Sequence, residues 1–337
     1  MKALILKSRN ELVSSVAPVP EPGENELLVK TKAAVICTSD ITDIRENPFN
    51  IKLPIIIGHE GAGVVVKTGA AVKNFKPGDR VTAHPVMHCG KCASCRRGLF
   101  HLCDDMRHLG FNRGGVFAEY FVIRADRARI VPDGLSFEES ALMEPVCVCL
   151  EALNRANVRE GSNVLIIGDG PFGIMISRLA ARRKPKRVII SGRHDYRLSR
   201  AGGALTINEK KEDAAEKISG LTGGEGADSC VVCVANKEAV SLGIDALRAR
   251  GTLCLFSGVS GKTPVDLFKV HVKELNIAGS CNDEGFLDEA LDLLLDKELD
   301  IGSVITYRFP FEKWEDAFYQ AEFGKERGLK AAVIFEG

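Results

Sequence analysis

The sequence predicts an α/β protein in which a doubly wound parallel sheet accompanies a second, mainly β domain. Three observations lead to this prediction. The 337 residues suffice for two domains at roughly 150 residues each. Short runs rich in Val, Ile and Ala, separated by turn residues, dominate the first ~150 residues. From Glu151 onward, apolar runs alternate with amphipathic helical segments, which is typical of βαβ units.

The N-terminal part is predicted to consist mainly of strands. Residues 27–30 (Leu-Leu-Val-Lys) and 63–67 (Gly-Val-Val-Val-Lys) are short, largely apolar runs, and turn signals stand at 22–23 and 77–79. These features place residues 1–150 in the mainly β domain.

Six strand-like runs follow, with helices such as 212–221 and 238–247 between them. The runs are 164–167, 188–190, 205–207, 230–234, 253–256 and 277–278. Strands that alternate with helices in this way form a parallel sheet covered on both faces. Residues 151–281 are therefore predicted to form the doubly wound domain.

The alternation ends near Gly279. A helix (286–295), a strand (304–309), a second helix (314–320) and a final strand (331–335) are expected in the tail. Because this order is not another βαβ unit, residues 282–337 are expected to return to the first domain.

The composition excludes several classes of protein. Lys plus Arg and Asp plus Glu each total 45, so no broad basic surface for nucleic acid or an anionic membrane is expected. The longest N-terminal apolar run, 3–6, is too short for a signal peptide or a membrane span. Eleven cysteines, an odd number, argue against a disulfide framework. A cytoplasmic protein is expected.

A glycine fingerprint follows the first strand of the doubly wound region. Gly168, Gly170 and Gly173 match G-x-G-x-x-G, with Pro171 and Phe172 between the second and third glycine. Such a loop lets a pyrophosphate approach the backbone at a helix N-terminus. Glycines are also common in purely structural turns. The position of the motif before a series of strands favours a dinucleotide-binding Rossmann domain.

Four cysteines within 15 residues predict a structural zinc site. Two-residue gaps separate Cys89, Cys92 and Cys95, and Cys103 follows after a short loop. Four thiolates complete a tetrahedron and leave no open position. An iron–sulfur cluster is the alternative, although no further cysteine spacing suggests an electron-transfer site. The neighbouring His84, His88 and His101 are interpreted as bystanders.

With these motifs together, the whole chain resembles the zinc-dependent medium-chain alcohol dehydrogenases, and within them the sorbitol and threonine dehydrogenase branch. The motifs that carry the resemblance, in order, are Cys37–Asp40, Gly58–Gly61, Cys89–Cys103, Gly115–Tyr120, Met143–Pro145, the glycine fingerprint and Tyr307–Pro310. The resemblance implies a chaperonin-10-like catalytic domain, with the active site between it and the nucleotide domain.

The resemblance also implies a catalytic zinc held by Cys37, His59 and Glu144, with Glu60 as an alternating ligand. Such a set leaves a coordination position open for water or an alcohol oxygen. Ser39 matches the hydroxyl that passes on the alcohol proton, and Asp40 the carboxylate that orients the imidazole.

Each of these residues also has a simpler interpretation, as a small buried thiol, a satisfied turn histidine or a helix-start carboxylate. Cys147 and Cys149 are further sulfur donors nearby.

Some positions depart from the branch. Thr42 stands where many relatives continue a proton relay with histidine, and Asp43 where polyol relatives often have an aromatic residue. The pair 282–283 is Asn-Asp instead of Arg-Tyr. Sorbitol itself is therefore not indicated as the substrate.

The cofactor is predicted to be NADP rather than NAD. Relatives that use NAD carry Asp at the end of the second strand, and that position here is Gly192. Arg193 and Arg197 offer guanidinium groups suited to a 2′-phosphate, and Ser191 adds a hydroxyl. In the alternative, Arg193 is a solvated charge and Asp195 serves the ribose. Asp195 is interpreted instead as a helix N-cap.

The expected function is a reversible, zinc-dependent hydride transfer between NAD(P) and a secondary alcohol of a polyol, sugar derivative or amino alcohol. A homodimer or homotetramer with two zincs per chain is expected. The alternative is a non-catalytic dinucleotide-binding sensor or structural protein on the same scaffold. Zinc-free quinone reductases share the fold but lack the cysteine lobe and the Gly-His-Glu motif.

Overall fold

The computed structural model describes residues 1–283 and 285–336. The chain divides into two compact units, which are Met1–Pro145 with Glu284–Gly337, and Val146–Asp283. Glu284 and Gly337, which belong to the predicted return segment 282–337, lie outside the described residues. The boundary between the units falls after Pro145, whereas the sequence predicts it after residue 150. Both positions lie within one helix, α4 (Met143–Arg155).

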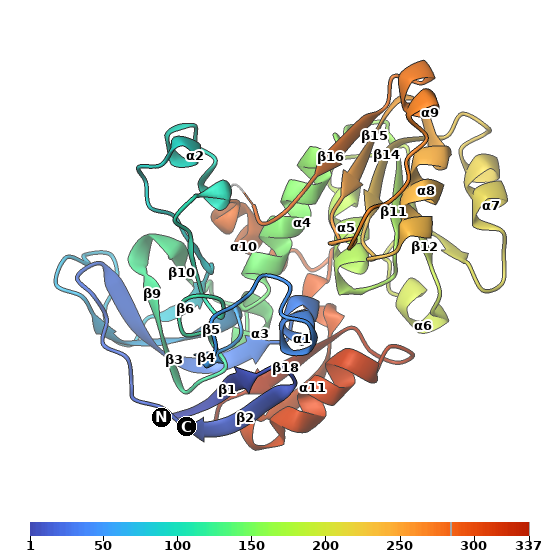
Figure 1. Cartoon of the computed structure of the whole chain (residues 1–337). Coiled ribbons are helices and arrows are strands. Elements are labelled where there is room, and N and C mark those ends of the chain that lie inside the picture. The colour runs from blue at the N-terminus through green and yellow to red at the C-terminus, as the bar shows by residue number, and fades with distance from the viewer. Residues whose placement is uncertain (284, 337) are drawn as a thin grey trace. The chain divides into compact units, whose positions relative to one another are not determined.

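The first unit contains three sheets (Figure 1). The largest has seven strands in the order β10-β6-β5-β3-β18-β17, with β9 also paired to β3. A three-stranded sheet β2-β1-β4 and a two-stranded sheet β7-β8 complete the set. The strands are β1 (Lys2–Ser8), β2 (Glu11–Val16), β3 (Glu26–Val35), β4 (Ile55–Ile56), β5 (Glu60–Thr68), β6 (Arg80–Ala83), β7 (Val86–Met87), β8 (Arg107–His108), β9 (Tyr120–Arg124), β10 (Ala128–Ile130), β17 (Ile305–Pro310) and β18 (Lys330–Ile334).

The C-terminal strand β18 joins this sheet by pairing antiparallel to β3, from Ala332 opposite Val35 to Ile334 opposite Ala33. The core beneath it combines aromatic side chains distant in sequence, because Phe117 packs edge-on against Phe318. The helices of this unit are α1 (Thr38–Arg45), α2 (Ala93–Arg96), α3 (Phe137–Ser140), α10 (Leu287–Leu295) and α11 (Trp314–Phe323), with α4 beginning at its border.

The second unit is a six-stranded parallel sheet in the order β13-β12-β11-β14-β15-β16. Its strands are β11 (Asn163–Ile167), β12 (Arg187–Gly192), β13 (Leu205–Asn208), β14 (Ala227–Val232), β15 (Leu247–Leu255) and β16 (Asn276–Gly279). Its further helices are α5 (Pro171–Ala181), α6 (Asp195–Leu198), α7 (Ala214–Leu221), α8 (Lys237–Ala246) and α9 (Leu267–Val272). This order confirms the predicted doubly wound sheet.

Both faces of the parallel sheet are covered. A Cβ at Gly173 of α5 would meet Ile166, whereas a Cβ at Gly243 of α8 would meet Ile167. Because successive residues of a strand face opposite sides, α5 and α8 lie on opposite faces. Burial on both faces explains why β11 is apolar throughout its last four residues instead of alternating.

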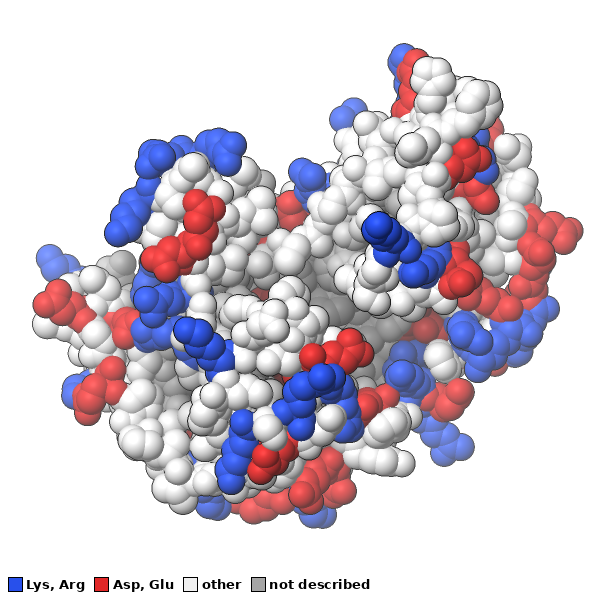
Figure 2. Space-filling model, in the orientation of Figure 1, with Lys and Arg blue, Asp and Glu red and all other residues white. Residues whose placement is uncertain are grey.

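Charges of both signs are interspersed on the face shown in Figure 2, in agreement with the zero formal charge. Among the described helices, none is long and apolar enough to cross a membrane.

Candidate functional site

The glycine fingerprint forms the turn between β11 and α5 in the second unit. Gly170 precedes the helix, whose first residues are Pro171 and Phe172. A Cβ at Gly173 would lie 1.9 Å from the carbonyl oxygen of Gly168, so only glycine lets the helix approach the turn this closely. The loop follows the carboxyl end of β11, where the strand order reverses between β12 and β14. Ligands of doubly wound sheets bind at this topological switch point.

Asp169, which lies between the first two glycines of the fingerprint, organises the end of β12. Oδ2 of Asp169 accepts hydrogen bonds of 2.7 Å from the backbone N–H groups of both Arg193 and His194. Nδ1 of His194 lies 3.1 Å from the same oxygen. A Cβ at Gly192 would lie 2.4 Å from the Cβ of Asp169. Gly192, whose lack of a carboxylate predicts NADP, is thus also required by the carboxylate of Asp169.

The other predicted cofactor residues lie at the same strand end. Ser191 is buried and its hydroxyl donates to Glu209. Arg193 is exposed, whereas Arg197 is 8% exposed. The prediction that Asp195 is an N-cap is wrong, because His194 holds that position in α6. The carboxylate of Asp195 instead binds Asn208 and Lys211, which draw it toward the end of β13.

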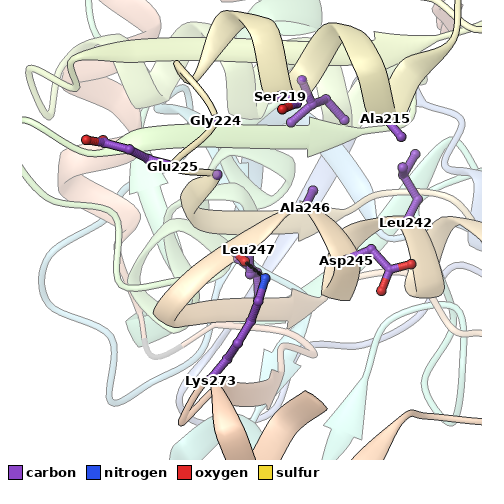
Figure 3. A pocket seen from close by; sticks show the side chains of 11 residues that line it. Ala215, Ser219, Gly224, Glu225, Leu242, Asp245, Ala246, Leu247 and Lys273 are labelled. Atoms are coloured by element: carbon purple, nitrogen blue, oxygen red, sulfur yellow. Dashed lines mark hydrogen bonds between the residues drawn. The ribbon is translucent and has the colours of Figure 1, made fainter.

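A small pocket in the same unit lies at the opposite edge of the sheet (Figure 3). Its lining includes Gly226, just before β14, and Leu247, the first residue of β15. Nζ of Lys273 donates to the carbonyl oxygen of Leu247 across it. Because it lies at the amino ends of the strands, this pocket is separate from the glycine loop.

The four cysteines of the first unit converge as predicted for a metal site. Sγ of Cys89 lies 4.0 Å from Sγ of Cys95, and Sγ of Cys92 lies 3.9 Å from Sγ of Cys103. Zn–S bonds near 2.3 Å give a tetrahedron whose edges are about 3.8 Å. These separations are far too long for disulfides. They match the edges of a tetrathiolate site.

The electrostatics of the lobe also suit a cation. Backbone N–H groups of Cys95 and Asp104 lower the pKa of Cys92 to about 6. Burial raises the pKa of Cys95 to about 12. The Cys92 thiol therefore ionises readily, whereas the Cys95 thiol does not. A bound divalent cation would favour the thiolate form of Cys95.

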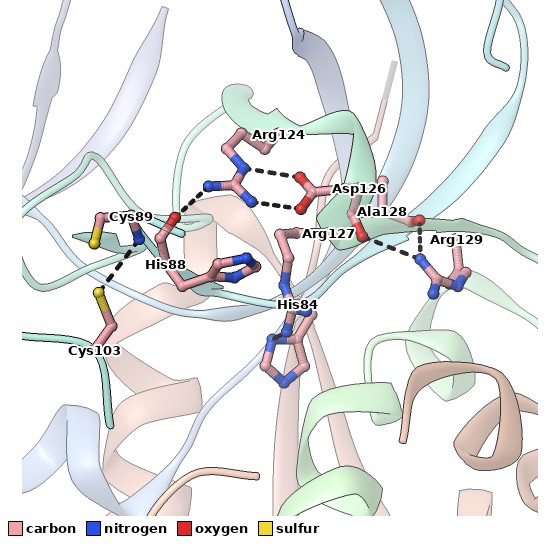
Figure 4. Close-up of polar contacts among 9 residues, drawn as sticks. All are labelled: His84, His88, Cys89, Cys103, Arg124, Asp126, Arg127, Ala128 and Arg129. Carbon is pink, nitrogen blue, oxygen red and sulfur yellow. Dashed lines mark hydrogen bonds and ion pairs between the residues drawn. The ribbon is translucent and has the colours of Figure 1, made fainter. Parts of the chain in front are cut away.

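The base of the lobe is held by β9 and the turn after it (Figure 4). Nη1 of Arg124 donates to the carbonyl oxygen of His88, at 2.6 Å, and the same guanidinium binds both oxygens of Asp126. The backbone N–H of Cys89 in turn contacts Sγ of Cys103, at 3.3 Å. The His88 ring contacts that of Phe100 in a tilted arrangement, with the ring centroids 4.2 Å apart. The four-cysteine group contains no histidine among the described residues.

A second candidate metal site joins Cys37, His59 and Glu60, whose ligand atoms lie within 4.8 Å of one another. Cys37 stands between β3 and α1, and Glu60 is the first residue of β5. Antiparallel pairing of these strands places Val35 opposite Glu60 and so brings the two strand ends together.

Asp40 orients this cluster. In the first turn of α1, its carboxylate accepts a 2.9 Å hydrogen bond from the backbone N–H of Cys37 and lies 3.1 Å from Nδ1 of His59. The side chain is 3% exposed. With Nδ1 held by Asp40, Nε2 of His59 is the ring nitrogen left for a metal. Ser39 lies in the same turn and is partly exposed.

Sequence reasoning missed Lys330, because no local motif marks it. Its Nζ lies 2.8 Å from Oε1 of Glu60, and Oε2 of Glu60 is buried without a hydrogen-bond partner among the described residues. Burial raises the pKa of both Cys37 and Glu60, against the opposing effects of His59 and Lys330. Cys37 and Glu60 are thus buried groups that become negative when they ionise, and Oε2 of Glu60 has no partner among the described residues. A zinc ion would stabilise their ionised forms and bind the free carboxylate oxygen.

The remaining predicted ligands lie on α4. Glu144, in its first turn, is 7% exposed and is not part of the three-residue group. The negative charge of Glu144 nevertheless acts on the ammonium of Lys330 and helps to raise the pKa of Lys330. Cys147 and Cys149 are buried on the same helix.

Comparison with known proteins agrees with this architecture. The family model described as the alcohol dehydrogenase GroES-like domain matches residues 23–133, and that of zinc-binding dehydrogenases matches residues 171–296. The chain is 30% identical to sorbitol dehydrogenase of Bacillus subtilis, over 99% of this chain and 97% of the relative. It is 33% identical to L-threonine 3-dehydrogenase of Anaeromyxobacter sp. (strain Fw109-5), over 94% of this chain and 95% of the relative.

A zinc-binding dehydrogenase from Sinorhizobium meliloti 1021, solved with NADP bound, superposes with a TM-score of 0.91 at 29% identity. The match covers 99% of this chain and 98% of that one. A doubly wound nucleotide-binding unit and a β unit with two candidate metal centres thus occur together in one chain. The chain belongs to the zinc-dependent medium-chain alcohol dehydrogenase family, in the branch of the sorbitol and threonine dehydrogenases. It is an NAD(P)-dependent, zinc-dependent dehydrogenase of alcohols.

Proposed function

We propose that this enzyme oxidises, reversibly and with NADP, a secondary alcohol on a polyol, sugar derivative or amino alcohol. The convergence of Cys37, His59 and Glu60 carries the proposal, because it supplies a thiolate, an imidazole and a carboxylate at one point. The sorbitol and threonine dehydrogenases among the relatives support this class of substrate.

Cys37, His59 and Glu60 would hold the catalytic zinc, with Glu144 as a further ligand. When bound, the metal would supply a Lewis acid that favours the deprotonated form of a substrate hydroxyl. Asp40 holds the imidazole of His59 in the ligating orientation. Ser39, partly exposed at the start of α1, would pass the proton toward solvent. Cys89, Cys92, Cys95 and Cys103 would hold a structural zinc.

NADP is favoured by the end of β12. Gly192 carries no carboxylate to repel a 2′-phosphate, and Arg193 is an exposed guanidinium beside it. The nearest carboxylate, on Asp169, is engaged by two backbone N–H groups and an imidazole. Ser191 and the buried Arg197 complete the proposed set.

Two measurements test the proposal. Metal analysis should give close to two zincs per chain. Turnover of a panel of polyols, sugar acids and amino alcohols should show a higher kcat/KM with NADP than with NAD. A chain that binds NADP but turns over none of the panel would favour the non-catalytic alternative, and a higher efficiency with NAD would overturn the cofactor assignment.

We further propose a homo-oligomer that forms through the edge of the parallel sheet. β16 is an edge strand, and large apolar side chains are exposed on it and on the neighbouring α9, namely Leu267, Phe268, Val272 and Ile277. Such patches mark protein–protein contacts. Light scattering should show that Phe268→Asp lowers the molar mass of the particle. Because thiolate zinc sites require reduced cysteines, we place the enzyme in the cytoplasm.

A further inference from the structure

The side chain of Asp169 fills the space beside Gly192 at the end of β12. A Cβ at Gly192 would lie 2.4 Å from Cβ of Asp169 and 2.6 Å from both its Cγ and its Oδ2. The Asp169 side chain is itself only 9% exposed. Because Cβ atoms essentially never approach other heavy atoms to within 3.0 Å, position 192 has no room for a side chain beside Asp169.

The same carboxylate fixes the backbone on both sides of Arg193. Its Oδ2 accepts hydrogen bonds of 2.7 Å from the N–H groups of Arg193 and His194. These N–H groups belong to the two peptide groups that flank the Cα of Arg193. Because each peptide group is planar, holding both of them fixes the direction in which the Arg193 side chain leaves the backbone.

Two backbone hydrogen bonds brace the residues just before Arg193. The N–H of Gly168, in the turn after β11, donates to the carbonyl oxygen of Ser191 at 2.8 Å. The N–H of Glu209, in the segment after β13, donates to the carbonyl oxygen of Gly192 at 2.8 Å. The exposed side chain of Arg193 therefore extends from a backbone that is held by both neighbouring strand ends.

We propose that Asp169 is a positioning residue that sets the cofactor specificity of this enzyme in two ways. It directs the guanidinium of Arg193 toward the 2′-phosphate of NADP, and it excludes from position 192 the carboxylate that would favour NAD. Neither effect requires Asp169 to touch the cofactor. This assignment rests on the proposed function, since it concerns the NADP preference of the same site.

Direct repulsion between the carboxylate of Asp169 and a 2′-phosphate predicts the opposite effect on binding. Because like charges repel at close range, the loss of a repelling carboxylate would strengthen the binding of NADP. Oδ2 of Asp169, however, already accepts from two backbone N–H groups, and Nδ1 of His194 lies 3.1 Å from it. The charge is thus compensated within the protein, and the main effect of Asp169 is expected through the backbone.

Equilibrium titrations with 2′,5′-ADP and with ADP measure the specificity without turnover. In Asp169→Ala, the Kd of 2′,5′-ADP should rise about 3- to 10-fold, as expected for immobilising one additional long side chain, while the Kd of ADP stays within about twofold. Asp169→Asn, whose side-chain oxygen can still accept from both N–H groups, should keep most of the wild-type ratio of the two constants. An equal loss for both ligands, or tighter binding of 2′,5′-ADP, would overturn the positioning role.

A double-mutant cycle separates positioning from a general weakening of the unit. The effect of Arg193→Ala on the Kd of 2′,5′-ADP should be about 3- to 10-fold smaller in the Asp169→Ala background than in the wild type, whereas additive losses would contradict the coupling. Asp228→Ala is the matched control, because Oδ2 of Asp228 accepts a 2.7 Å hydrogen bond from the backbone N–H of Asn163, at the amino end of β11. It should leave the ratio of the two constants unchanged.

The exclusion at position 192 is tested by stability and by the same two ligands. Gly192→Asp alone should lower the melting temperature, because its Cβ would meet Asp169. Since Cβ of Asp169 is the nearest atom, only glycine at position 169 frees the space. Gly192→Asp/Asp169→Gly should therefore recover the melting temperature and bind ADP more tightly than 2′,5′-ADP. A Gly192→Asp single variant that melts like the wild type and prefers ADP would overturn the exclusion.

The wild type tests the proposed function separately from the role of Asp169. A wild type that binds ADP more tightly than 2′,5′-ADP would overturn the NADP assignment and the role of Asp169 together. A wild type that prefers 2′,5′-ADP, with the same ratio of dissociation constants in Asp169→Ala, would overturn the positioning role of Asp169 alone.

Discussion

Nζ of Lys330 lies 2.8 Å from Oε1 of Glu60, and the two side chains are 2% and 0% exposed. The residues are 270 positions apart in the chain, on β18 and β5 of one sheet. The ammonium occupies one oxygen of the carboxylate and leaves the other, Oε2, facing no protein donor among the described residues. Glu60 is thus fixed on one side and available to a metal on the other.

Removal of this ammonium should be costly. Lys330→Met leaves a buried carboxylate without its cation, and such changes lower the free energy of unfolding by about 3–5 kcal/mol. The double variant Lys330→Met/Glu60→Gln removes both charges and should recover part of the loss. Urea unfolding of wild type, single and double variants checks this. A single variant as stable as the wild type would show that the pair is not a stabilising contact.

The four-cysteine lobe should be needed for folding before it is needed for chemistry. Cys92→Ser opens the tetrahedron, so zinc content should fall from about two to about one per chain and the melting temperature should drop. Cys281→Ser, at an exposed cysteine, is the matched control and should change neither quantity. Retention of both zincs by Cys92→Ser, measured by elemental analysis, would contradict the structural assignment.

The Cys37–His59–Glu60 group should be needed for turnover. His59→Ala removes a proposed ligand and should lower kcat by about 10³-fold or more, while NADP still quenches protein fluorescence. Asp40→Asn, which weakens the contact with Nδ1 of His59, should cost about 10–100-fold. Normal turnover in His59→Ala would eliminate this group as the catalytic centre.

Arg193 should distinguish the two cofactors. Loss of a charge-assisted contact to a 2′-phosphate predicts that Arg193→Ala raises the KM for NADP about 10–100-fold and changes that for NAD little. Titration with 2′,5′-ADP and with ADP should show the same difference without turnover. Lys184→Ala, at an exposed lysine just after α5, is the control. Equal weakening of both ligands would count against the assignment.

Acid should destabilise the chain partly through His108. The pKa of His108 is about 3 in the folded chain and about 6.5 when unfolded. Between these values the unfolded chain binds a proton that the folded chain does not. This contribution is complete above pH ~6.5 and declines as pH falls, by up to about 1.4 kcal/mol per pH unit. The urea midpoint of His108→Phe should fall less between pH 7.5 and 5.5 than that of the wild type. Parallel losses would refute the effect.

Local patterns were sufficient for much of this protein. The apolar runs predicted the strands of the parallel sheet, because its central strands β11 and β14 are buried on both faces. β15 begins earlier than predicted, at Leu247, since the charged and small residues 248–251 hide its start. The spacing of Cys89, Cys92, Cys95 and Cys103 was enough to predict their convergence, because all four lie on one short lobe.

Other relationships depend on where distant segments meet. Asp169 reaches the backbone after Gly192 only because β11 and β12 are adjacent in the sheet. Lys330 meets Glu60, and His108 meets His59, through packing within the first unit. Composition and spacing alone therefore determined the fold class, the cysteine lobe and the glycine loop, whose contacts are local. The tertiary structure decided which buried charges are paired and which acceptors stay open, because desolvation and charge pairing depend on neighbours that no local pattern specifies.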